Sequence, residues 1–212
     1  MPKPPRIYVL AGVNGAGKSS IGGAAFRASG ADYYNPDEAA RELRDARPGL
    51  TSTEANAAAW RKGRTLLERA IQERHDFAFE TTLGGNTIPR LLGAAAASGI
   101  NVLVWFVGLE SPEMHVERVA ARVRRGGHPI PEEVIRRRYE RSRLNLIQLM
   151  PSVTALRVYD NSDHAEPEAG GTPLPRLILH LEMGRILGPE DLSRTPDWAK
   201  PIVAAALQSL RG

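Results

Sequence analysis

The 212-residue sequence contains no cysteine, and this absence removes several kinds of chemistry at once. Without cysteine the chain forms no disulfide bond, binds no zinc ion through thiolates and has no cysteine nucleophile. No hydrophobic run is long enough to span a membrane. The short apolar run near the N-terminus lacks the pattern of a signal peptide. We therefore expect a cytoplasmic protein that does not enter a membrane.

The sequence also lacks a large excess of charge of either sign, because its net charge is only +4. Its basic residues are mostly arginine, and many lie between Arg118 and Arg143. Such a cluster can contact nucleic acid or clamp the phosphates of a small molecule. The mild net charge and the sparse aromatic interleaving of this stretch argue against a dedicated nucleic-acid-binding protein.

What the sequence does contain is a complete phosphate-loop pattern, G-x-x-x-x-G-K-[ST], at residues 12–19. An apolar run at residues 7–11 predicts a buried strand before it, and residues 19–29 predict a helix after it. The glycines let backbone N–H groups converge on a phosphate, which the helix dipole also favours. A chance glycine turn is the alternative, but the strand–loop–helix context favours a site for ATP. Its expected ligands are Gly12, Asn14, Gly15, Ala16, Gly17, Lys18, Ser19 and Ser20. Lys18 would reach the β- and γ-phosphates, and the Ser19 hydroxyl would hold Mg²⁺.

Strands and helices alternate along the chain, which predicts an α/β fold with a doubly wound, mostly parallel sheet of five to six strands. We expect one P-loop NTPase domain over residues 1–212, with a core at 6–162, a helical lid at 112–145 and a C-terminal strand and helix at 174–210. Ligands of such sheets bind beyond the carboxyl ends of the strands. The candidate site residues follow the first, second, third and fifth predicted strands, so they are expected at one edge.

Two acids, Asp37 and Glu38, follow the second predicted strand. Transfer of a phosphoryl group to a hydroxyl needs a carboxylate that orients the hydroxyl and accepts its proton. Alternatively, both acids only stabilise a helix N-terminus, by about 0.3–1 kcal/mol each. We assign that role to Glu38, and for Asp37 both interpretations stay open.

The apolar strand at residues 77–79 ends abruptly in Glu80, Thr81 and Thr82. Glu80 could orient a substrate hydroxyl or hold Mg²⁺ through water. A strand end with internally bonded polar side chains is the alternative. The sharp change in polarity favours substrate binding by these three residues.

Arg118 and Arg122 are four residues apart, so they share one face of a predicted helix beside a Gly-Gly hinge. Arginines in that position can close over a triphosphate and stabilise transition-state charge. His128 lies in the hinge and is either a phosphate contact or an ordinary loop histidine. The remaining arginines of the cluster are expected mostly on a solvated face, with one of the last three at the site: Arg124, Arg125, Arg136, Arg137 and Arg138.

Taken in order, these segments resemble the zeta-toxin family of P-loop kinases, in its compact single-domain bacterial branch. The resemblance covers residues 6–162 and rests on five segments. They are residues 11–19 (AGVNGAGKS), 35–38 (NPDE), 79–82 (FETT), 126–133 (GGHPIPEE) with 137–139 (RRY), and 159–162 (YDNS).

The resemblance implies an ATP- and Mg²⁺-dependent kinase whose best-known acceptor is the 3′-hydroxyl of the sugar in UDP-N-acetylglucosamine. It implies that Asp37 is the base, that Glu80 and the two threonines meet the nucleotide-sugar, and that lid arginines hold phosphates. Asn161 is carried over as a nucleotide contact. In the larger toxins a second lid arginine lies past the hinge; here Gly-Gly-His occupies that area, so no second arginine is carried over.

Toxins of this family are held inactive by an antitoxin, so a protein partner is implied too. Two alternatives remain: a kinase of a nucleotide or nucleic-acid end, and a non-catalytic ATP-binding module.

Overall fold

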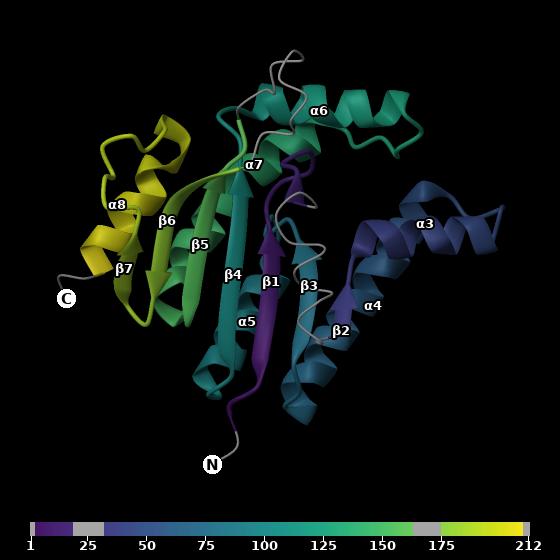
Figure 1. Ribbon diagram of the computed structural model, residues 1–212. Coiled ribbons are helices and arrows are strands. Elements are labelled where there is room, and N and C mark those ends of the chain that lie inside the picture. Colours follow the sequence, from purple (N-terminus) through teal and green to yellow (C-terminus); the bar gives the residue numbers. More distant parts are fainter. Residues whose placement is uncertain (1–2, 19–31, 163–174, 210–212) are drawn as a thin grey trace.

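The computed structural model describes residues 3–18, 32–162 and 175–209. Its sheet has the strand order β2-β3-β1-β4-β5-β6-β7 (Figure 1). The first five strands in this order are parallel. They are β1 (Arg6–Ala11), β2 (Asp32–Tyr34), β3 (Phe77–Thr81), β4 (Asn101–Gly108) and β5 (Ala155–Asp160).

An antiparallel hairpin, β6 (Arg176–Glu182) and β7 (Arg185–Gly188), extends the sheet beyond β5. The sheet thus has seven strands, and the expectation of five to six was wrong by the strand β7. Its two-residue turn is Met183-Gly184, and both residues have positive φ angles. The usual sequences of such turns are Asn-Gly and Asp-Gly, so Met183-Gly184 gave no recognisable signal for the turn and for β7, whereas a C-terminal strand at the position of β6 was expected.

Six α-helices and two 3₁₀ turns are described. The helices are α3 (Pro36–Ala46), α4 (Ser52–Glu73), α5 (Thr87–Ala97), α6 (Pro112–Arg124), α7 (Glu132–Leu149) and α8 (Lys200–Ser209). The 3₁₀ turns are η1 (Met150–Ser152) and η3 (Asp197–Ala199).

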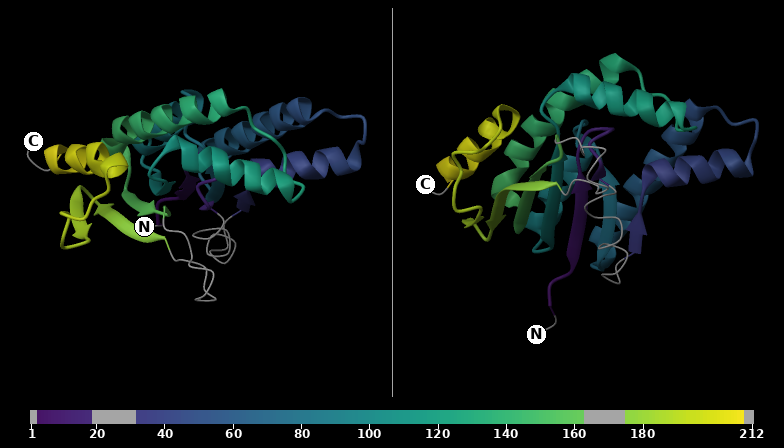
Figure 2. Two further views of the ribbon diagram at one scale, coloured as in Figure 1. Left: turned by 90° about the horizontal axis from the view of Figure 1, so that it is seen from above. Right: turned by 45° about the horizontal axis from the view of Figure 1, so that its top comes forward.

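The main hydrophobic core lies between the sheet and the helices α4, α5 and α7, which cover one face (Figures 1 and 2). A smaller cluster on the other face contains Leu10, Ala78 and Val107. The helix expected at residues 19–29 falls outside the described residues. No helix in the described part of the chain is long and apolar enough to cross a membrane.

Sequence-encoded caps fix where the helices beside the site begin. The Asn35 side chain accepts hydrogen bonds from the backbone N–H groups of Asp37 and Glu38, which starts α3 directly after β2. Thr51 and Glu54 form a reciprocal capping box at the start of α4. Asp37 is therefore held in the first turn of a capped helix, beside the end of β2.

The helix α6 lies beyond the carboxyl ends of the parallel strands (Figure 1). The helix α7 begins near the same edge but ends in the core, where Leu146 and Leu149 are buried. Ser142 donates to the carbonyl oxygen of Thr82, and Asn145 donates to those of Leu83 and Gly85. The second half of α7 is thus fixed to the loop after β3, and the expected lid at residues 112–145 takes in part of a core helix.

Candidate active site

The phosphate loop follows β1 and has a backbone shape that requires glycine. Gly12, Gly15 and Gly17 have φ angles of 144°, 83° and 82°. A Cβ atom at Gly12 would lie only 2.3 Å from the carbonyl oxygen of Val107 on the neighbouring strand β4. Glycine at these positions lets the loop turn tightly against the sheet.

Lys18 lies at the end of this loop, and its Nζ donates to the carbonyl oxygen of Gly12 at 3.0 Å. Burial lowers the pKa of Lys18, while the nearby carboxylates of Glu80 and Asp37 oppose that shift. The cations Arg122 and Arg138 lower the pKa further. Lys18 is therefore surrounded by two acids and two arginines that come from four other elements of the chain.

Glu80 ends the buried part of β3 and is only 8% exposed. Its Oε1 accepts from the Tyr33 hydroxyl and from Asn35 Nδ2, the latter at 3.2 Å. Both donors belong to β2 or to the residue that follows it, so two neighbouring strand ends hold this carboxylate in place. A carboxylate held in this way can orient a hydroxyl group without reorganising.

The two threonines after Glu80 have local roles in the structure. Thr81 Oγ1 accepts from the Leu83 N–H at 3.1 Å, and Thr82 Oγ1 accepts from the Gly84 N–H at 3.3 Å. The backbone carbonyl of Thr81 accepts from the Gly12 N–H at 3.2 Å, which ties β3 to the phosphate loop. Their hydroxyls thus shape the turn that closes this side of the site.

Asp37 lies in the first turn of α3 and faces the helix α6. Arg122 Nη1 is 3.6 Å from Asp37 Oδ2, and His128 Nε2 is 4.0 Å from Asp37 Oδ1. Arg122 Nη2 also donates to the carbonyl oxygen of His128 at 3.2 Å. Burial is the main cause that lowers the pKa of His128, and Asp37 opposes it. The three side chains close the site from the side of the lid.

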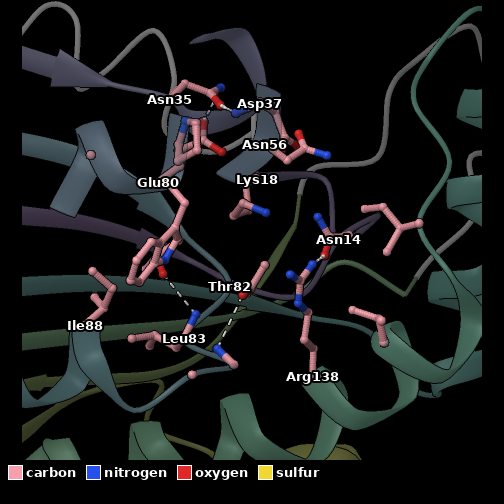
Figure 3. A pocket seen from close by; sticks show the side chains of 18 of the residues that line it. Asn14, Lys18, Asn35, Asp37, Asn56, Glu80, Thr82, Leu83, Ile88 and Arg138 are labelled. Atoms are coloured by element: carbon pink, nitrogen blue, oxygen red, sulfur yellow. Dashed lines mark hydrogen bonds between the residues drawn. The ribbon is translucent and has the colours of Figure 1, made fainter. Parts of the chain in front are cut away.

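One cavity of about 1050 Å³ connects these groups (Figure 3). Seven of the predicted residues line it: Asn14, Lys18, Asp37, Glu80, Thr81, Thr82 and His128. Figure 3 shows Lys18 between Asp37 and Glu80 on one side and Asn14 on the other. The structure therefore brings together residues that are up to 114 positions apart in the printed sequence, from 14 to 128.

Two predicted residues lie elsewhere around the phosphate loop. Arg118 Nη2 donates to the carbonyl oxygen of Asn161 at 2.7 Å, and Asn161 Nδ2 donates to the carbonyl oxygen of Ala16 at 2.8 Å. Neither lines the cavity, and the same is true of Arg122 and of the loop residues Gly12, Gly15, Ala16 and Gly17. Ser19 and Ser20 lie outside the described residues.

Arg138 is the arginine that the sequence could not single out. Its Nη1 donates to Asn14 Oδ1 at 2.6 Å, and it lines the cavity opposite Asp37. Burial lowers the pKa of Arg138, and Asp37 opposes that shift. A Cβ atom at Gly84 would come within 2.7 Å of Arg138 Cγ, so this glycine leaves space for the arginine stem. A second cation is thus built into the site from α7.

Sequence reasoning also missed His115 and Tyr33, because neither stands in a recognisable motif. His115 Nδ1 lies 2.9 Å from the carbonyl oxygen of Asn14, so a buried histidine of α6 contacts the phosphate loop. Other residues of the cavity lining were missed as well, among them Asn56, Trp60, Arg64, Ile88 and Arg141. Arg137, one of the three arginines that the sequence left open, also lines the cavity.

The described residues contain no group of three or more His, Cys, Asp or Glu side chains that could hold a metal ion by themselves. Mg²⁺ in kinases needs no such group, because one or two carboxylates, phosphates and water complete its shell. Asp37 and Glu80 both face Lys18 and fit that requirement.

Comparison with known proteins agrees with this geometry. The sequence model of the family described as Zeta toxin matches residues 1–166. The chain belongs to the zeta toxin family. An uncharacterized protein of Haemophilus influenzae is 31% identical over 129 residues, which are 60% of this chain and 88% of that protein.

Solved structures confirm the α/β fold of this zeta toxin family member. The native AvrRxo1-ORF1:-ORF2 complex has a TM-score of 0.67 at 15% identity and covers 97% of this chain and 71% of that chain. The same complex with ATP has a TM-score of 0.66 at 15% identity; the match covers 96% of this chain but only 64% of that one. The PezAT toxin–antitoxin system of Streptococcus pneumoniae has a TM-score of 0.54 at 14% identity, and the match covers 100% of this chain and 88% of that chain.

Proposed function

We propose that this protein is an ATP-dependent kinase, one P-loop domain over residues 1–212, that transfers the γ-phosphate to a hydroxyl group of a small molecule. The observation that carries the proposal is the convergence of Lys18, Asp37, Glu80 and Arg138 on one cavity, with Arg122 paired to Asp37. A site that only bound ATP would need the lysine but not two carboxylates beside it. Membership of the zeta toxin family supports the same activity.

In the proposed reaction the phosphate loop and Lys18 hold the β- and γ-phosphates. Asp37 accepts the proton of the acceptor hydroxyl, whose oxygen forms the new bond to phosphorus while the bond to ADP breaks. Glu80 orients the hydroxyl, and Arg122 and Arg138 stabilise the charge that spreads over the transferred group. Mg²⁺ bound with ATP would neutralise part of the phosphate charge, held through water by Glu80 or Asp37 and directly by Ser19.

As the acceptor we propose UDP-N-acetylglucosamine, phosphorylated at the 3′-hydroxyl of its sugar. The cavity of about 1050 Å³ is at the upper end of ligand-site volumes, so it has room for more than a triphosphate and a hydroxyl. Its far wall offers Trp60 for a flat ring and Arg64, Arg137 and Arg141 for phosphates. This combination suits a nucleotide-sugar.

The PezAT structure belongs to a toxin–antitoxin system, which supports the proposal of an antitoxin partner for this chain. We also propose a cytoplasmic location, because the proposed donor ATP is available there.

The first test uses purified protein with Mg-ATP and a mixture of nucleotide-sugars and oligonucleotides, analysed by mass. We expect one nucleotide-sugar to gain a single phosphate. Phosphorylation of oligonucleotides alone would contradict the proposal that the acceptor is a nucleotide-sugar and would favour a nucleic-acid kinase. ATP binding without transfer to any component would favour a non-catalytic module.

Variants test the roles within the site. Asp37→Ala should lower kcat by about 10²–10⁴-fold, the usual contribution of a general base. Lys18→Ala should lower kcat by about 10²–10³-fold, because the phosphates lose one hydrogen-bond donor. The matched control is Asp45→Ala, an exposed acid on the same helix α3. Undiminished phosphorylation by Asp37→Ala would contradict the assignment of the base.

A further inference from the structure

The C-terminal part of the chain lies beyond the family match at residues 1–166. One of its side chains nevertheless contacts residues that hold the phosphate loop. Trp198, in the 3₁₀ turn η3, is only 3% exposed. A Cβ atom at Gly108 would lie 2.3 Å from the indole ring, so the ring packs directly on the backbone at the end of β4. The preceding residue, Val107, is the one whose carbonyl faces Gly12.

The polar end of the indole has a defined partner. Trp198 Nε1 donates to Asp160 Oδ1 at 3.1 Å, and Asp160 is itself only 7% exposed. Arg176 Nη2, also from the C-terminal part, lies 3.4 Å from Asp160 Oδ2, and the Ser162 hydroxyl donates to Oδ1. A buried carboxylate without its donors would be costly, so these groups determine how Asp160 lies.

Asn161 follows Asp160 and makes three contacts at the phosphate loop and its surroundings. Its N–H donates to the carbonyl of Gly108 at 3.0 Å, and its Nδ2 donates to the carbonyl of Ala16 at 2.8 Å. Its own carbonyl accepts from Arg118 at 2.7 Å. The orientation of Asp160 therefore fixes a residue that holds the phosphate loop on one side and a lid arginine on the other.

We propose that Trp198 is a positioning residue for ATP binding, acting through Asp160 and Asn161 on the phosphate loop. The proposal rests on the proposed function, since it takes the loop to bind ATP. It makes the C-terminal segment part of the nucleotide site although none of its described residues, 175–209, lines the cavity. The Nε1–H group carries the effect, and the ring alone does not.

The experiment compares Trp198→Phe with Trp105→Phe, and titrates each with ATP by calorimetry. Phenylalanine keeps a ring against Gly108 but removes the donor to Asp160. Trp105 is the matched control because it lies on the same strand as Gly108 and packs near Tyr8 and Arg157, away from Asp160. We expect Trp198→Phe to bind ATP about tenfold more weakly, which equals about 1.4 kcal/mol. The control should bind as the wild type does, and the KM for the acceptor should not change in either variant.

A lower melting temperature with unchanged ATP affinity in Trp198→Phe would overturn the proposal, because it would show a purely structural role. If that variant does not fold, Arg176→Met decides, since it removes another donor to Asp160 from a partly exposed side chain. Arg176→Met should also weaken ATP binding, and wild-type affinity there would overturn the proposal. Wild-type protein that binds ATP but transfers nothing would contradict the proposed function alone, whereas absence of ATP binding would overturn both.

Discussion

The buried side chain of His115 fits its surroundings only in the uncharged form. Its Nδ1 faces a carbonyl oxygen, which can only accept, so this nitrogen carries the hydrogen. Its Nε2 is buried and has no hydrogen-bond partner in the described part of the chain. A second proton would sit on that nitrogen. Burial lowers the pKa of His115 to about 4, and Lys18, Arg118 and Arg143 add to the effect.

This shift predicts a dependence of stability on pH. Because the folded-state pKa lies below the ordinary value of 6.5, the stabilisation is fully present above about pH 6.5 and is lost as the pH falls to about 4. The difference corresponds to about 3 kcal/mol. Urea unfolding between pH 4 and 7 should therefore be less pH-dependent in His115→Gln, which cannot titrate. The control is His75→Gln, whose side chain is 39% exposed. Equal pH dependence in wild type and His115→Gln would contradict this account.

At the scale of an element, α4 forms the outer wall of the cavity through Asn56 and Trp60. Its start is fixed by the capping box, in which Thr51 Oγ1 accepts from the Glu54 N–H at 3.2 Å and Glu54 accepts from the Thr51 N–H at 3.0 Å.

Removal of this cap should measurably lower the free energy of unfolding. Thr51→Ala should lower the free energy of unfolding by about 1 kcal/mol, because the Glu54 N–H at the helix end loses its acceptor, the Thr51 hydroxyl. Thr53→Ala, one residue beyond the first helical position, is the control and should change stability by less than about 0.5 kcal/mol. Chemical denaturation of the two variants compares them directly, and equal losses would argue that the box is unimportant.

The elements with clear local signals could be predicted from the sequence. The apolar run at residues 7–11 lies in β1, and the run at residues 77–79 lies in β3. The position of Asp37 and Glu80 after the second and third predicted strands placed both at the cavity, whereas Asn161, after the fifth, does not line it. The boundary of the lid could not be predicted, because Ser142 and Asn145 look like surface residues until their bonds to a distant loop are known.

The choice among adjacent arginines shows the same limit. Arg136 pairs with Glu113 and Glu132 on the surface, whereas Arg138, half a turn later, reaches Asn14. Nothing in three consecutive arginines distinguishes them, since tertiary contacts decide that Arg137 and Arg138 line the cavity and Arg136 does not.

At the scale of the whole molecule, the site is assembled from both halves of the chain. The helix α3 and the strand β3 supply Asp37 and Glu80, and the helices α6 and α7 supply Arg122 and Arg138. A ligand that contacts both groups must stabilise the folded protein as a unit.

We therefore expect ATP to raise the melting temperature. At 100 times its Kd, ATP should stabilise the fold by about 2.7 kcal/mol, or about 5–10 °C for a chain of this size. Thermal melts with and without Mg-ATP measure the shift. Lys18→Ala should lose most of it, whereas Asp37→Ala should keep it, because the base acts on the acceptor. A shift that survives in Lys18→Ala would show that ATP binds elsewhere.

The two outer strands of the sheet are its shortest, with three residues in β2 and four in β7. A strand at an edge exposes N–H and C=O groups that can pair with another molecule and begin aggregation. Short edges offer few such groups, and the exposed Arg185 adds a charge at the β7 edge. The long apolar strands β1 and β4 lie inside the sheet, paired on both sides. Once the protein has folded, the strand order thus keeps the long apolar strands, which are the most prone to aggregate, from pairing with another molecule.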